Sequence, residues 1–518
     1  MREYPLYIGG RRQAAEDWTY VPRASALLRD PRGAMRRMAE LQSGRKPVAE
    51  DDEVVAGRCA IAGREDVDRA LEAAYAARRT AAAVPLEDRR ALASAAHRDI
   101  ARHAAELAEL LVAEGHPRRL AAWEIESILE GSGDETMDWC FGQLRQEFRV
   151  DGRRILLLRK PDGVVCLNPP QNAAGANASL GISVLLAGNT LVLKAPRTSP
   201  LTTMHLYLEI VAPLLEEADV PGGALNVVCG STKPILRTWL ESPLVDDVMF
   251  FGDSRVGLEF GLECTARGKK PVLELAGNDG FVVWADAELD SAAAALVESF
   301  YGSSQICMVP KYALLHPAVT DDFIELFLEH VRGLRPGYPE DPEVVLSPVL
   351  KAGMFDDYLA EARERGAEVI AGGERMDVAG RPAADGPFVQ PTVIRVDGIE
   401  GARELRCVRE ETFFPLLPLV VAEVAPPDVL LDRALTFVDS NEYGLRNSLW
   451  ARDDAVVEAF VGSLRNGGLL KVNDSHLGMA PYLAGHGGTG LTGGPHGELH
   501  YPMLRTTHLQ GVSVADGA

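Results

Sequence analysis

The sequence has few cysteines and no long apolar run, and both absences narrow what the chain can be. Its seven cysteines among 518 residues show neither a CxxC pair nor a Cys/His ligand spacing. This pattern argues against a disulfide framework and a zinc site, so we expect no metal. No stretch approaches the roughly 18 uninterrupted apolar residues of a membrane span. The start, MREYPLYIGG, lacks the apolar segment of a secretory signal, and we expect a cytoplasmic protein.

Positive charge is also scarce. The chain carries 53 Lys and Arg against 75 Asp and Glu, a formal net charge of −22. Such a total repels phosphate backbones, so we expect no nucleic-acid partner. The remaining composition, 47% hydrophobic and 25% charged, is typical of a globular protein.

The length favours about three domains, because 518 residues exceed one ordinary core. Apolar residues recur at three- and four-residue spacing from Glu65 to Glu114, which predicts helices. Before them, the segment Val21 to Glu53 holds a short amphipathic piece interrupted by proline and glycine. We interpret it as a peripheral appendage.

From about residue 152 onward, short apolar runs alternate with helical stretches. The first series contains RILLLRK, GVVCLN, NTLVLKAP, ALNVVCG and VDDVMFFG. A second series starts at PVLELAG and GFVVWAD and continues to GLLKVN. This alternation predicts βαβ units and doubly wound parallel sheets, an α/β fold that binds ligands in the loops after its strands.

Cys307 lies in a polar loop, YGSSQICMVP, between a helical stretch and a strand. A cysteine in such a loop is more accessible than one inside an apolar run. To react as a nucleophile it needs a lowered pKa, from nearby backbone N–H groups or positive charge. The alternative is a buried, inert thiol, which is the more common fate of a cysteine.

Glu274 ends the apolar strand PVLELAG. A carboxylate inside such a run must be paired or functional, because burying it alone is costly. A general base with a raised pKa needs a place of this kind. A structural ion pair at the strand end is an equally good interpretation.

Two features favour a phosphate-bearing cofactor. The turn FFGDSRVG, with Gly252, Asp253 and Ser254, follows a strand and opens a helix, whose free N–H groups can bind phosphate. Lys194 ends the strand LVLK, where its side chain could bind a ribose or phosphate of the cofactor. Alone, each signal is weak, and a solvated lysine is the commoner case.

Taken together, these motifs resemble the NAD(P)-dependent aldehyde dehydrogenase superfamily over most of the chain. The motifs that carry the resemblance, in order, are LYIGG, GREDVDRALEAAYAA, NPPQN, AGNTLVLKAP, PGGALNVVCG, FFGDSRVG, ELAGNDGFVVWADAELDSAA, SSQIC, GPFVQPTV, EETFFP, NEYGL and KVND. One such motif could arise by chance, whereas their common order could not.

The resemblance implies a subunit of three parts. A Rossmann-like cofactor domain would comprise residues 1–144 and 161–275, and an α/β catalytic domain residues 276–485. A small β oligomerisation hairpin would combine residues 145–160 with 486–518. Members of the family usually form homodimers or homotetramers through that hairpin.

The resemblance also implies a mechanism. The thiolate of Cys307 attacks an aldehyde, and the side-chain amide of Asn172 and the backbone N–H of Cys307 hold the oxyanion. Hydride transfer to the nicotinamide leaves a thioester, and Glu274 activates the water that hydrolyses it to the free acid. The alternatives are an acyl-transferring semialdehyde dehydrogenase, whose relatives usually lack this glutamate, and a non-catalytic homologue with an altered cofactor site.

For the cofactor, NADP or NAD, the resemblance assigns further residues. Lys194 would bind the adenosine ribose, and Gly252 and Ser254 would meet the pyrophosphate. Glu411 would hold the nicotinamide ribose, with Phe413 beside the ring.

Two departures from the family pattern also lie at the cofactor. Asp253 is a good helix N-cap, but its charge opposes a pyrophosphate. Arg197 replaces a frequent glutamate and would suit a 2′-phosphate, so we expect a modest preference for NADP.

The substrate tunnel is expected by position in the family. The residues assigned to it are Leu180, Ile306, Met308, His476 and Tyr482. For His476, an exposed loop position is the more common alternative. The aldehyde itself is not specified by these residues.

Overall fold

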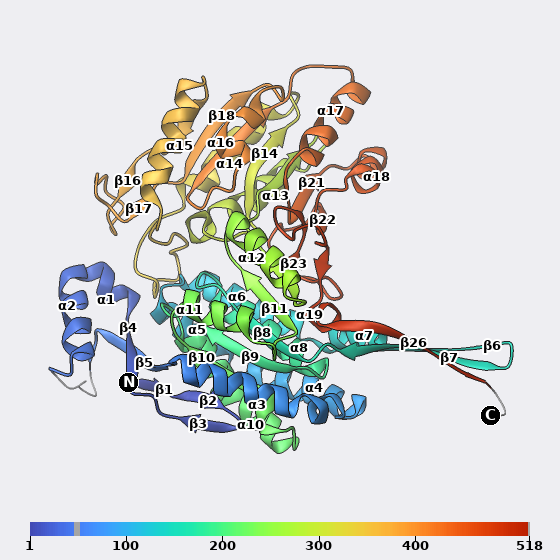
Figure 1. Ribbon diagram of the computed structural model, residues 1–518. Coiled ribbons are helices and arrows are strands. Elements are labelled where there is room, and N and C mark those ends of the chain that lie inside the picture. The colour runs from blue at the N-terminus through green and yellow to red at the C-terminus, as the bar shows by residue number, and fades with distance from the viewer. Residues whose placement is uncertain (46–51, 516–518) are drawn as a thin grey trace.

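The computed structural model describes residues 1–45 and 52–515, and two doubly wound sheets form its framework (Figure 1). In the first sheet the strands from β12 to β10 run parallel, and β2 and β3 are added antiparallel at one edge. Its order is β12 (Lys270–Glu274), β11 (Asp247–Phe251), β8 (Val164–Asn168), β9 (Thr190–Ala195), β10 (Leu225–Cys229), β2 (Leu6–Ile8) and β3 (Arg11–Gln13).

Helices cover both faces of this sheet because alternate side chains of each strand point to opposite faces. On β9, Leu191 and Leu193 share a core with Ile182 of α8 (Ala174–Leu186). Val192, between them, belongs to the other core together with Val67 of α3 (Arg64–Ala82). The continuous apolar character of the strand is therefore explained by burial on two sides.

The second sheet follows directly in the chain, since only a short loop separates β12 from β13. Its strands are parallel except for β15, which pairs antiparallel with β18. The order is β15 (Glu368–Ala371), β18 (Thr392–Asp397), β19 (Leu416–Val421), β14 (Pro310–Leu315), β13 (Asp279–Val283), β21 (Arg446–Trp450) and β22 (Leu469–Val472). The expected α/β fold with two parallel sheets is thus confirmed.

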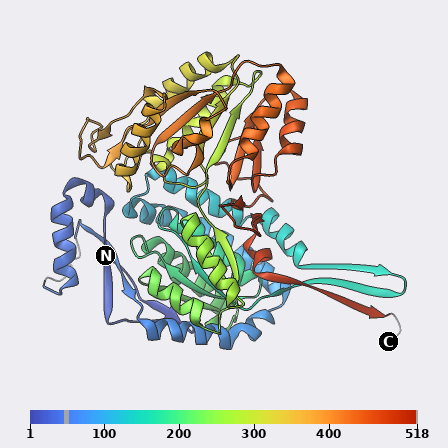
Figure 2. The same ribbon diagram turned by 45° about the horizontal axis from the view of Figure 1, so that its top comes forward.

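A long hairpin projects from the body of the molecule (Figures 1 and 2). Its strands β6 (Arg145–Val150) and β7 (Arg153–Pro161) are joined by Asp151 and Gly152, both with positive φ, as a two-residue hairpin turn requires. The C-terminal strand β26 (Thr507–Ala515) pairs along the whole of β7. The predicted strand pair near 145–160 is therefore present, and the extended C-terminus joins it.

The helices on the N-terminal side differ from the prediction in one respect. The helical stretch expected from 65 to 114 is three helices, α3, α4 (Leu86–Arg102) and α5 (Ala104–Glu114), broken at Pro85 and His103. The other helices in the body are α6 (Arg118–Gly131), α7 (Asp134–Leu144), α9 (Leu201–His205), α10 (Ala212–Glu217), α11 (Thr232–Glu241), α12 (Ser254–Ala266), α13 (Leu289–Leu296), α14 (Thr320–Arg332), α15 (Ala352–Glu364), α16 (Arg406–Arg409), α17 (Pro427–Asp439), α18 (Asp454–Ser463) and α19 (Pro502–Arg505).

The segment before these helices is an appendage with its own short elements. It connects β4 (Asp17–Pro22) with β5 (Val55–Ile61), which form a small sheet together with β1 (Arg2–Tyr4), and it holds α1 (Ala24–Arg29) and α2 (Pro31–Gln42). Asp30 caps α2 by accepting from the N–H of Gly33, and Leu28 packs against a core of the second sheet. Residues 46–51 of the predicted appendage lie outside the described residues.

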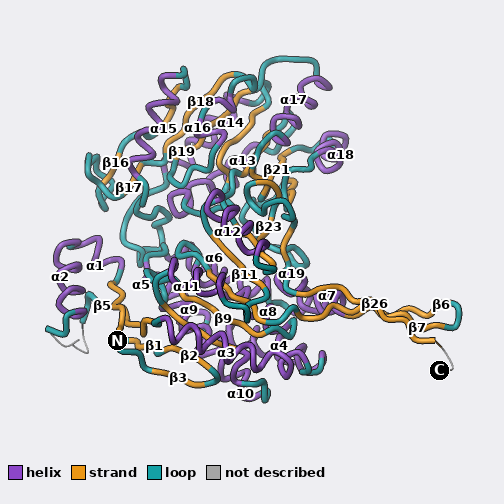
Figure 3. Tube along the Cα trace, viewed as in Figure 1, coloured by secondary structure: helices purple, strands orange, loops and turns teal. Residues whose placement is uncertain are grey.

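Short strand pairs from the C-terminal region lie between the two large sheets, where the trace in Figure 3 shows mainly loops and short strands. They are β20 (Tyr443–Gly444) with β24 (Thr489–Gly490), and β23 (His486–Gly487) with β25 (Leu499–His500); β16 (Arg375–Met376) and β17 (Phe388–Val389) pair at the second sheet. No helix within residues 1–45 and 52–515 is long and apolar enough to cross a membrane.

Candidate active site

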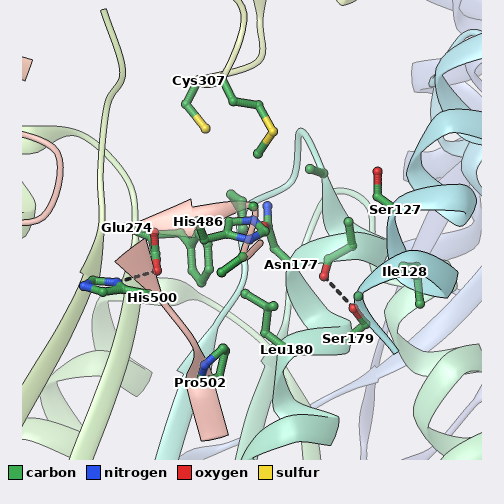
Figure 4. Close-up of a pocket in the computed structure, with 18 of the residues that line it drawn as sticks. Ser127, Ile128, Asn177, Ser179, Leu180, Glu274, Cys307, His486, His500 and Pro502 are labelled. Carbon is green, nitrogen blue, oxygen red and sulfur yellow. Dashed lines mark hydrogen bonds and ion pairs between the residues drawn. The ribbon is translucent and has the colours of Figure 1, made fainter. Parts of the chain in front are cut away.

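A cavity of about 360 Å³ lies at the carboxyl ends of β11 and β12, beside the loop that carries Cys307. Helices α4, α6, α7 and α8 and the segment after residue 478 form the rest of its wall. This is the edge at which parallel sheets bind ligands. Figure 4 shows Cys307 on one side of the cavity, with Glu274, His486 and Asn177 across from it.

The loop before Cys307 is held in a conformation that needs support. Ser303 and Ser304 have positive φ, 57° and 60°, which costs energy in a residue with a side chain. Their hydroxyl groups donate to backbone carbonyls, that of Ser303 to Ser347 at 2.6 Å. Gln305 adds a hydrogen bond from its side chain to the carbonyl of Pro348 at 2.8 Å. These bonds fix the position of the cysteine.

Cys307 is half-buried, whereas each of the other six cysteines is buried. Burial raises the pKa of its thiol to about 12, and the negative charges of Glu411 and Asp279 add to the effect. The lowered pKa that a reactive cysteine needs is therefore absent when only the protein's own groups surround it. Formation of the thiolate therefore needs a base or an additional positive charge near the sulfur.

Asn172 lies beside the same loop. Its side-chain amide donates to the backbone carbonyl of Gln305 at 3.0 Å, and both Asn172 and Cys307 line the cavity. The amide thus contacts the backbone two residues before Cys307.

Glu274 lines the cavity, and its carboxylate is paired there. Burial alone would raise its pKa, yet the charge and hydrogen bond of His500, the charge of His486 and the N–H of Gly487 together hold it below its ordinary range. The Nδ1 of His500 lies 2.7 Å from Oε1, and Gly487 N–H donates to Oε2 at 2.7 Å. Of the two interpretations of Glu274, the structure shows the paired carboxylate, because His500 and Gly487 each bond to one of its oxygens.

The two histidines are the site residues that the sequence analysis missed. They face each other in the strand pair β23–β25, and the Nε2 of His486 lies 2.5 Å from Oδ1 of Asn177. His500 is 226 positions from Glu274 in the chain. A single sequence contains no spacing signal for a contact between residues so far apart in the chain. The one available signal is the glycine-rich surrounding of His486, which indicates a close approach of backbone.

On the other side of Cys307 lie several residues predicted to hold the cofactor. Gly252, Asp253, Glu411 and Phe413 all line the cavity. Asp253 caps α12 by accepting from the N–H of Val256 at 3.1 Å, as expected of an aspartate before a helix. Glu411 accepts from Gly277 N–H at 2.9 Å, and burial raises its pKa.

Ser254, the first residue of α12, is buried, and its hydroxyl has no partner within the part of the chain that the structure describes. A buried polar atom without a partner at a helix N-terminus suits an anionic ligand. The donors at this position therefore fit the pyrophosphate of a dinucleotide.

Lys194 and Arg197 lie outside the wall of this cavity. Lys194 ends β9, is buried, and burial lowers its pKa to about 8. Arg197 is exposed, and its Nη1 donates to the hydroxyl of Ser231 at 3.3 Å. Lys194 lies near the end of β9 and Arg197 just after it, and neither lines the cavity.

Of the residues expected in the tunnel, Leu180, Ile306 and Met308 line the cavity. His476 does not. It is fully buried, with its Nδ1 2.6 Å from the hydroxyl of Ser448 and its Nε2 3.1 Å from Asp279. Burial lowers its pKa to about 3, so the ring is neutral. Both interpretations of His476, tunnel wall and exposed loop, were wrong, because a loop position does not reveal an inward polar network.

Tyr482 is also absent from the cavity wall. Its side chain is exposed, and its backbone carbonyl accepts from the hydroxyl of Tyr501. The following residues Leu483 and Ala484 line the cavity in its place. The positive φ of Tyr482, 68°, turns the chain so that the expected side chain points outward.

The aldehyde dehydrogenase family model matches residues 42–512. The chain belongs to the aldehyde dehydrogenase family. It is 28% identical over 490 residues to a 3,6-anhydro-alpha-L-galactose dehydrogenase of Vibrio sp. (strain EJY3), covering 92% of both chains. It is 29% identical to a vanillin dehydrogenase of Pseudomonas fluorescens over 98% of both. The solved NAD-dependent aldehyde dehydrogenase of Sinorhizobium meliloti has a TM-score of 0.82 at 25% identity, with 100% of this chain and 95% of that chain covered.

Family membership makes this chain an oxidoreductase that oxidises an aldehyde with a nicotinamide cofactor. Solved structures of the same fold include an NAD-dependent and an NADP-dependent enzyme, and either cofactor is compatible with the fold. Within residues 1–45 and 52–515, no group of three or more His, Cys, Asp or Glu could hold a metal ion.

The buried thiol of Cys307 predicts a distinctive pH dependence of alkylation. With a pKa of about 12, the thiolate fraction rises about tenfold per pH unit well below that value. We expect the rate of iodoacetamide modification of the cofactor-free enzyme to climb from pH 7 to 10 without a plateau, with the label on Cys307 by peptide mass spectrometry. A Cys307→Ser variant is the control and should remain unlabelled. A plateau near pH 8 would contradict the prediction.

Proposed function

We propose that this enzyme oxidises an apolar aldehyde to its carboxylic acid through a covalent intermediate on Cys307. The supporting observation is that Cys307, Asn172 and Glu274 line a single cavity. The sulfur bonds to the aldehyde carbon, and the amide of Asn172 and the backbone N–H of Cys307 stabilise the oxyanion. Loss of hydride gives a thioester. Glu274 then takes a proton from water as its oxygen bonds to the thioester carbon, and the carbon–sulfur bond breaks.

The cofactor, when bound, accepts the hydride. Ser254 and the N-terminus of α12 would hold its pyrophosphate, and Glu411 the nicotinamide ribose, with Phe413 beside the ring. We assign residues 1–144 and 161–275 to cofactor binding and 276–485 to catalysis. Supporting this division, the first sheet ends at Glu274 and the second begins at Asp279.

Transfer of the acyl group to another acceptor is the second candidate, and Glu274 argues against it. Its carboxylate lies in the cavity and is ionised, so it can activate water. A non-catalytic homologue would have no reason to keep both this glutamate and a strained loop that fixes Cys307.

The substrate class is inferred from the cavity beyond Cys307. Its wall there is built largely from apolar and small side chains, which are Ala93, Ala96, Ile128, Met137, Cys140, Ala176, Leu180, Ile182, Leu186, Pro502 and Met503. The charged residues on the whole wall are Glu130, Asp253, Glu274, Lys351 and Glu411, so negative charge prevails. An aldehyde carrying a carboxylate would be repelled, whereas an aromatic or aliphatic body would be buried favourably. The name of the vanillin dehydrogenase to which the chain is similar is consistent with this class.

We expect kcat/KM to be on the order of 100-fold higher for benzaldehyde than for succinate semialdehyde, because the cavity wall carries four carboxylates against one cation, Lys351. Reduced cofactor formed at 340 nm measures both rates. Leu180→Arg, which adds a cation to the wall, should narrow the ratio. Leu262→Arg changes an exposed leucine and serves as the control. Equal kcat/KM values for the two aldehydes in the wild type would refute this substrate class.

We also propose a modest preference for NADP over NAD. Arg197 is exposed and lies close to the end of β9, near Lys194. A guanidinium there can pair with the 2′-phosphate that distinguishes NADP. The opposing factor is Asp253, whose charge disfavours either cofactor.

The expected result for Arg197→Ala is a fall of about tenfold in kcat/KM with NADP, as for the loss of one charge-assisted hydrogen bond, and little change with NAD. Arg237→Ala, which removes an exposed arginine paired with Glu241, is the matched control. A wild-type enzyme that prefers NAD, or a variant that loses both activities equally, would disprove the assignment.

Finally, we propose that the chain forms a homodimer or homotetramer through the hairpin, residues 145–160 with 486–518, of which 516–518 lie outside the described residues. The support is apolar surface on a projecting element, with Phe148, Val150 and Leu509 exposed on one face of the hairpin and Val514 exposed on the other. Exposed apolar side chains gathered on one element mark a contact surface.

A double variant, Phe148→Lys with Leu509→Lys, should shift the mass measured by light scattering toward that of the monomer, 56.0 kDa. Charge on a buried interface is costly. The control, Val424→Lys, alters a valine that is 90% exposed elsewhere and should leave the mass unchanged. A wild-type mass equal to the monomer would rule out the proposal.

A further inference from the structure

His500 forms the most direct contact that Glu274 makes with another side chain, and the mechanism above gives it no role. Its Nδ1 lies 2.7 Å from Oε1 of Glu274, with 1% and 5% of the two side chains exposed. Because a carboxylate only accepts, Nδ1 must carry the proton and donate. Figure 4 shows His500 on the side of Glu274 away from Asn177 and Leu180.

The second nitrogen of His500 supports one orientation of the ring. Nε2 is buried and has no partner within the part of the chain that the structure describes. With or without a proton, this nitrogen makes no hydrogen bond in the described structure, so the bond from Nδ1 to Glu274 is the one that orients the ring. The ring lines the cavity, and its hydrogen bond within the described residues goes to Glu274 through Nδ1.

Other titratable groups also face Glu274, from each of the neighbouring segments. They are His486 of β23, His500 of β25 and Cys307 of the loop before β14. His486 has its Nε2 engaged by Asn177, and the thiol of Cys307 repels the carboxylate once it is ionised. His500 is the one of the three that bonds to the carboxylate directly.

The strand pair β23–β25 explains why both bonds to Glu274 are kept together. Gly487 of β23 pairs with Leu499 of β25, and His486 pairs with His500. The Gly487 N–H donates to Oε2 while His500 donates to Oε1. A side chain at Gly487 would collide with the backbone of Glu498, and its φ is 100°, so the close approach requires glycine. The strand pair β23–β25 therefore supplies a hydrogen-bond donor to each oxygen of the Glu274 carboxylate.

We propose that His500 is a positioning residue for the hydrolytic step, which holds Glu274 charged and oriented so that it can deprotonate the water attacking the Cys307 thioester. This inference rests on the proposed function. In the step, the water proton goes to Glu274, the hydroxide oxygen bonds to the acyl carbon, and the acid leaves as the carbon–sulfur bond breaks. Glu274 then returns the proton to the sulfur of Cys307.

The test compares two amide replacements of different length, His500→Asn and His500→Gln. Asparagine can place an N–H near the position of Nδ1, whereas glutamine places its amide near Nε2, beyond Glu274. Decay of the Cys307 acyl-enzyme formed with benzaldehyde and NADP is followed by quenched mass spectrometry from pH 5 to 9. Thermal unfolding of each variant checks that it is folded.

We expect the acid limb of the decay rate to move up by about three pH units in His500→Gln, because a fully buried carboxylate without its partner is protonated more readily. At pH 6 the rate should fall about tenfold or more, and near pH 9 it should approach that of the wild type. His500→Asn should shift the limb less. His508→Leu, at an exposed histidine, is the control and should leave the profile unchanged.

The outcomes separate this inference from the proposed function. If the wild type forms no acyl adduct on Cys307, the proposed function fails and this inference with it. If the adduct forms but both His500 variants keep the wild-type acid limb, or lose rate equally at every pH, the positioning role alone is overturned.

Discussion

The site depends on keeping the carboxylate of Glu274 charged, although only 5% of its side chain is exposed. Glu274 ends a strand that is buried on both faces, and an isolated carboxylate there would cost several kcal/mol or become protonated. The chain solves this with parts from its far end. A glycine-rich segment returns more than 200 residues later and supplies a backbone N–H and an imidazole to the two carboxylate oxygens. The position of that segment, and hence one wall of the cavity, follows from this requirement.

Cys307 poses the opposite problem, because its surroundings oppose the charged form of the thiol. Burial and the carboxylates of Glu411, Asp279 and Glu274 outweigh the charge of Lys311, whose ammonium group donates to the backbone carbonyls of Ser304 and Thr412. The loop is therefore organised to fix the position of the sulfur rather than to activate it. This arrangement suits an enzyme in which the positive charge of the nicotinamide ring arrives with the cofactor. A thiol that was already reactive without the cofactor would be prone to oxidation.

Much of this architecture could be predicted from the sequence, for identifiable reasons. Strands such as β8, β9 and β11 are continuous apolar runs bounded by polar loops, and every one was located within a few residues. Cys307 and Glu274 stand out because a thiol in a polar loop and a carboxylate in an apolar strand both break a local pattern. Asp253 before α12 follows the ordinary preference of helix N-caps.

The errors have a common physical origin. His476 and Tyr482 lie in a loop with no periodicity, so the direction of each side chain is set by long-range contacts, such as that between His476 and Asp279. The sign of the pKa shift at Glu274 likewise depends on His500, and sequence spacing says nothing of that contact. Burial could be anticipated from composition, whereas the partner of a buried group could not.

The C-terminal strand also carries a constraint on engineering. Tyr501 to Thr506, which include the short helix α19, are all that separate His500 from β26. β26 in turn is locked to β7 along its full length. A one-residue insertion between them would demand either a slip in strand register, about 3.3 Å along the chain with every side chain reversed, or a displaced imidazole. Tags and fusions are therefore best placed after Ala515, which is the last residue of β26 that pairs with β7.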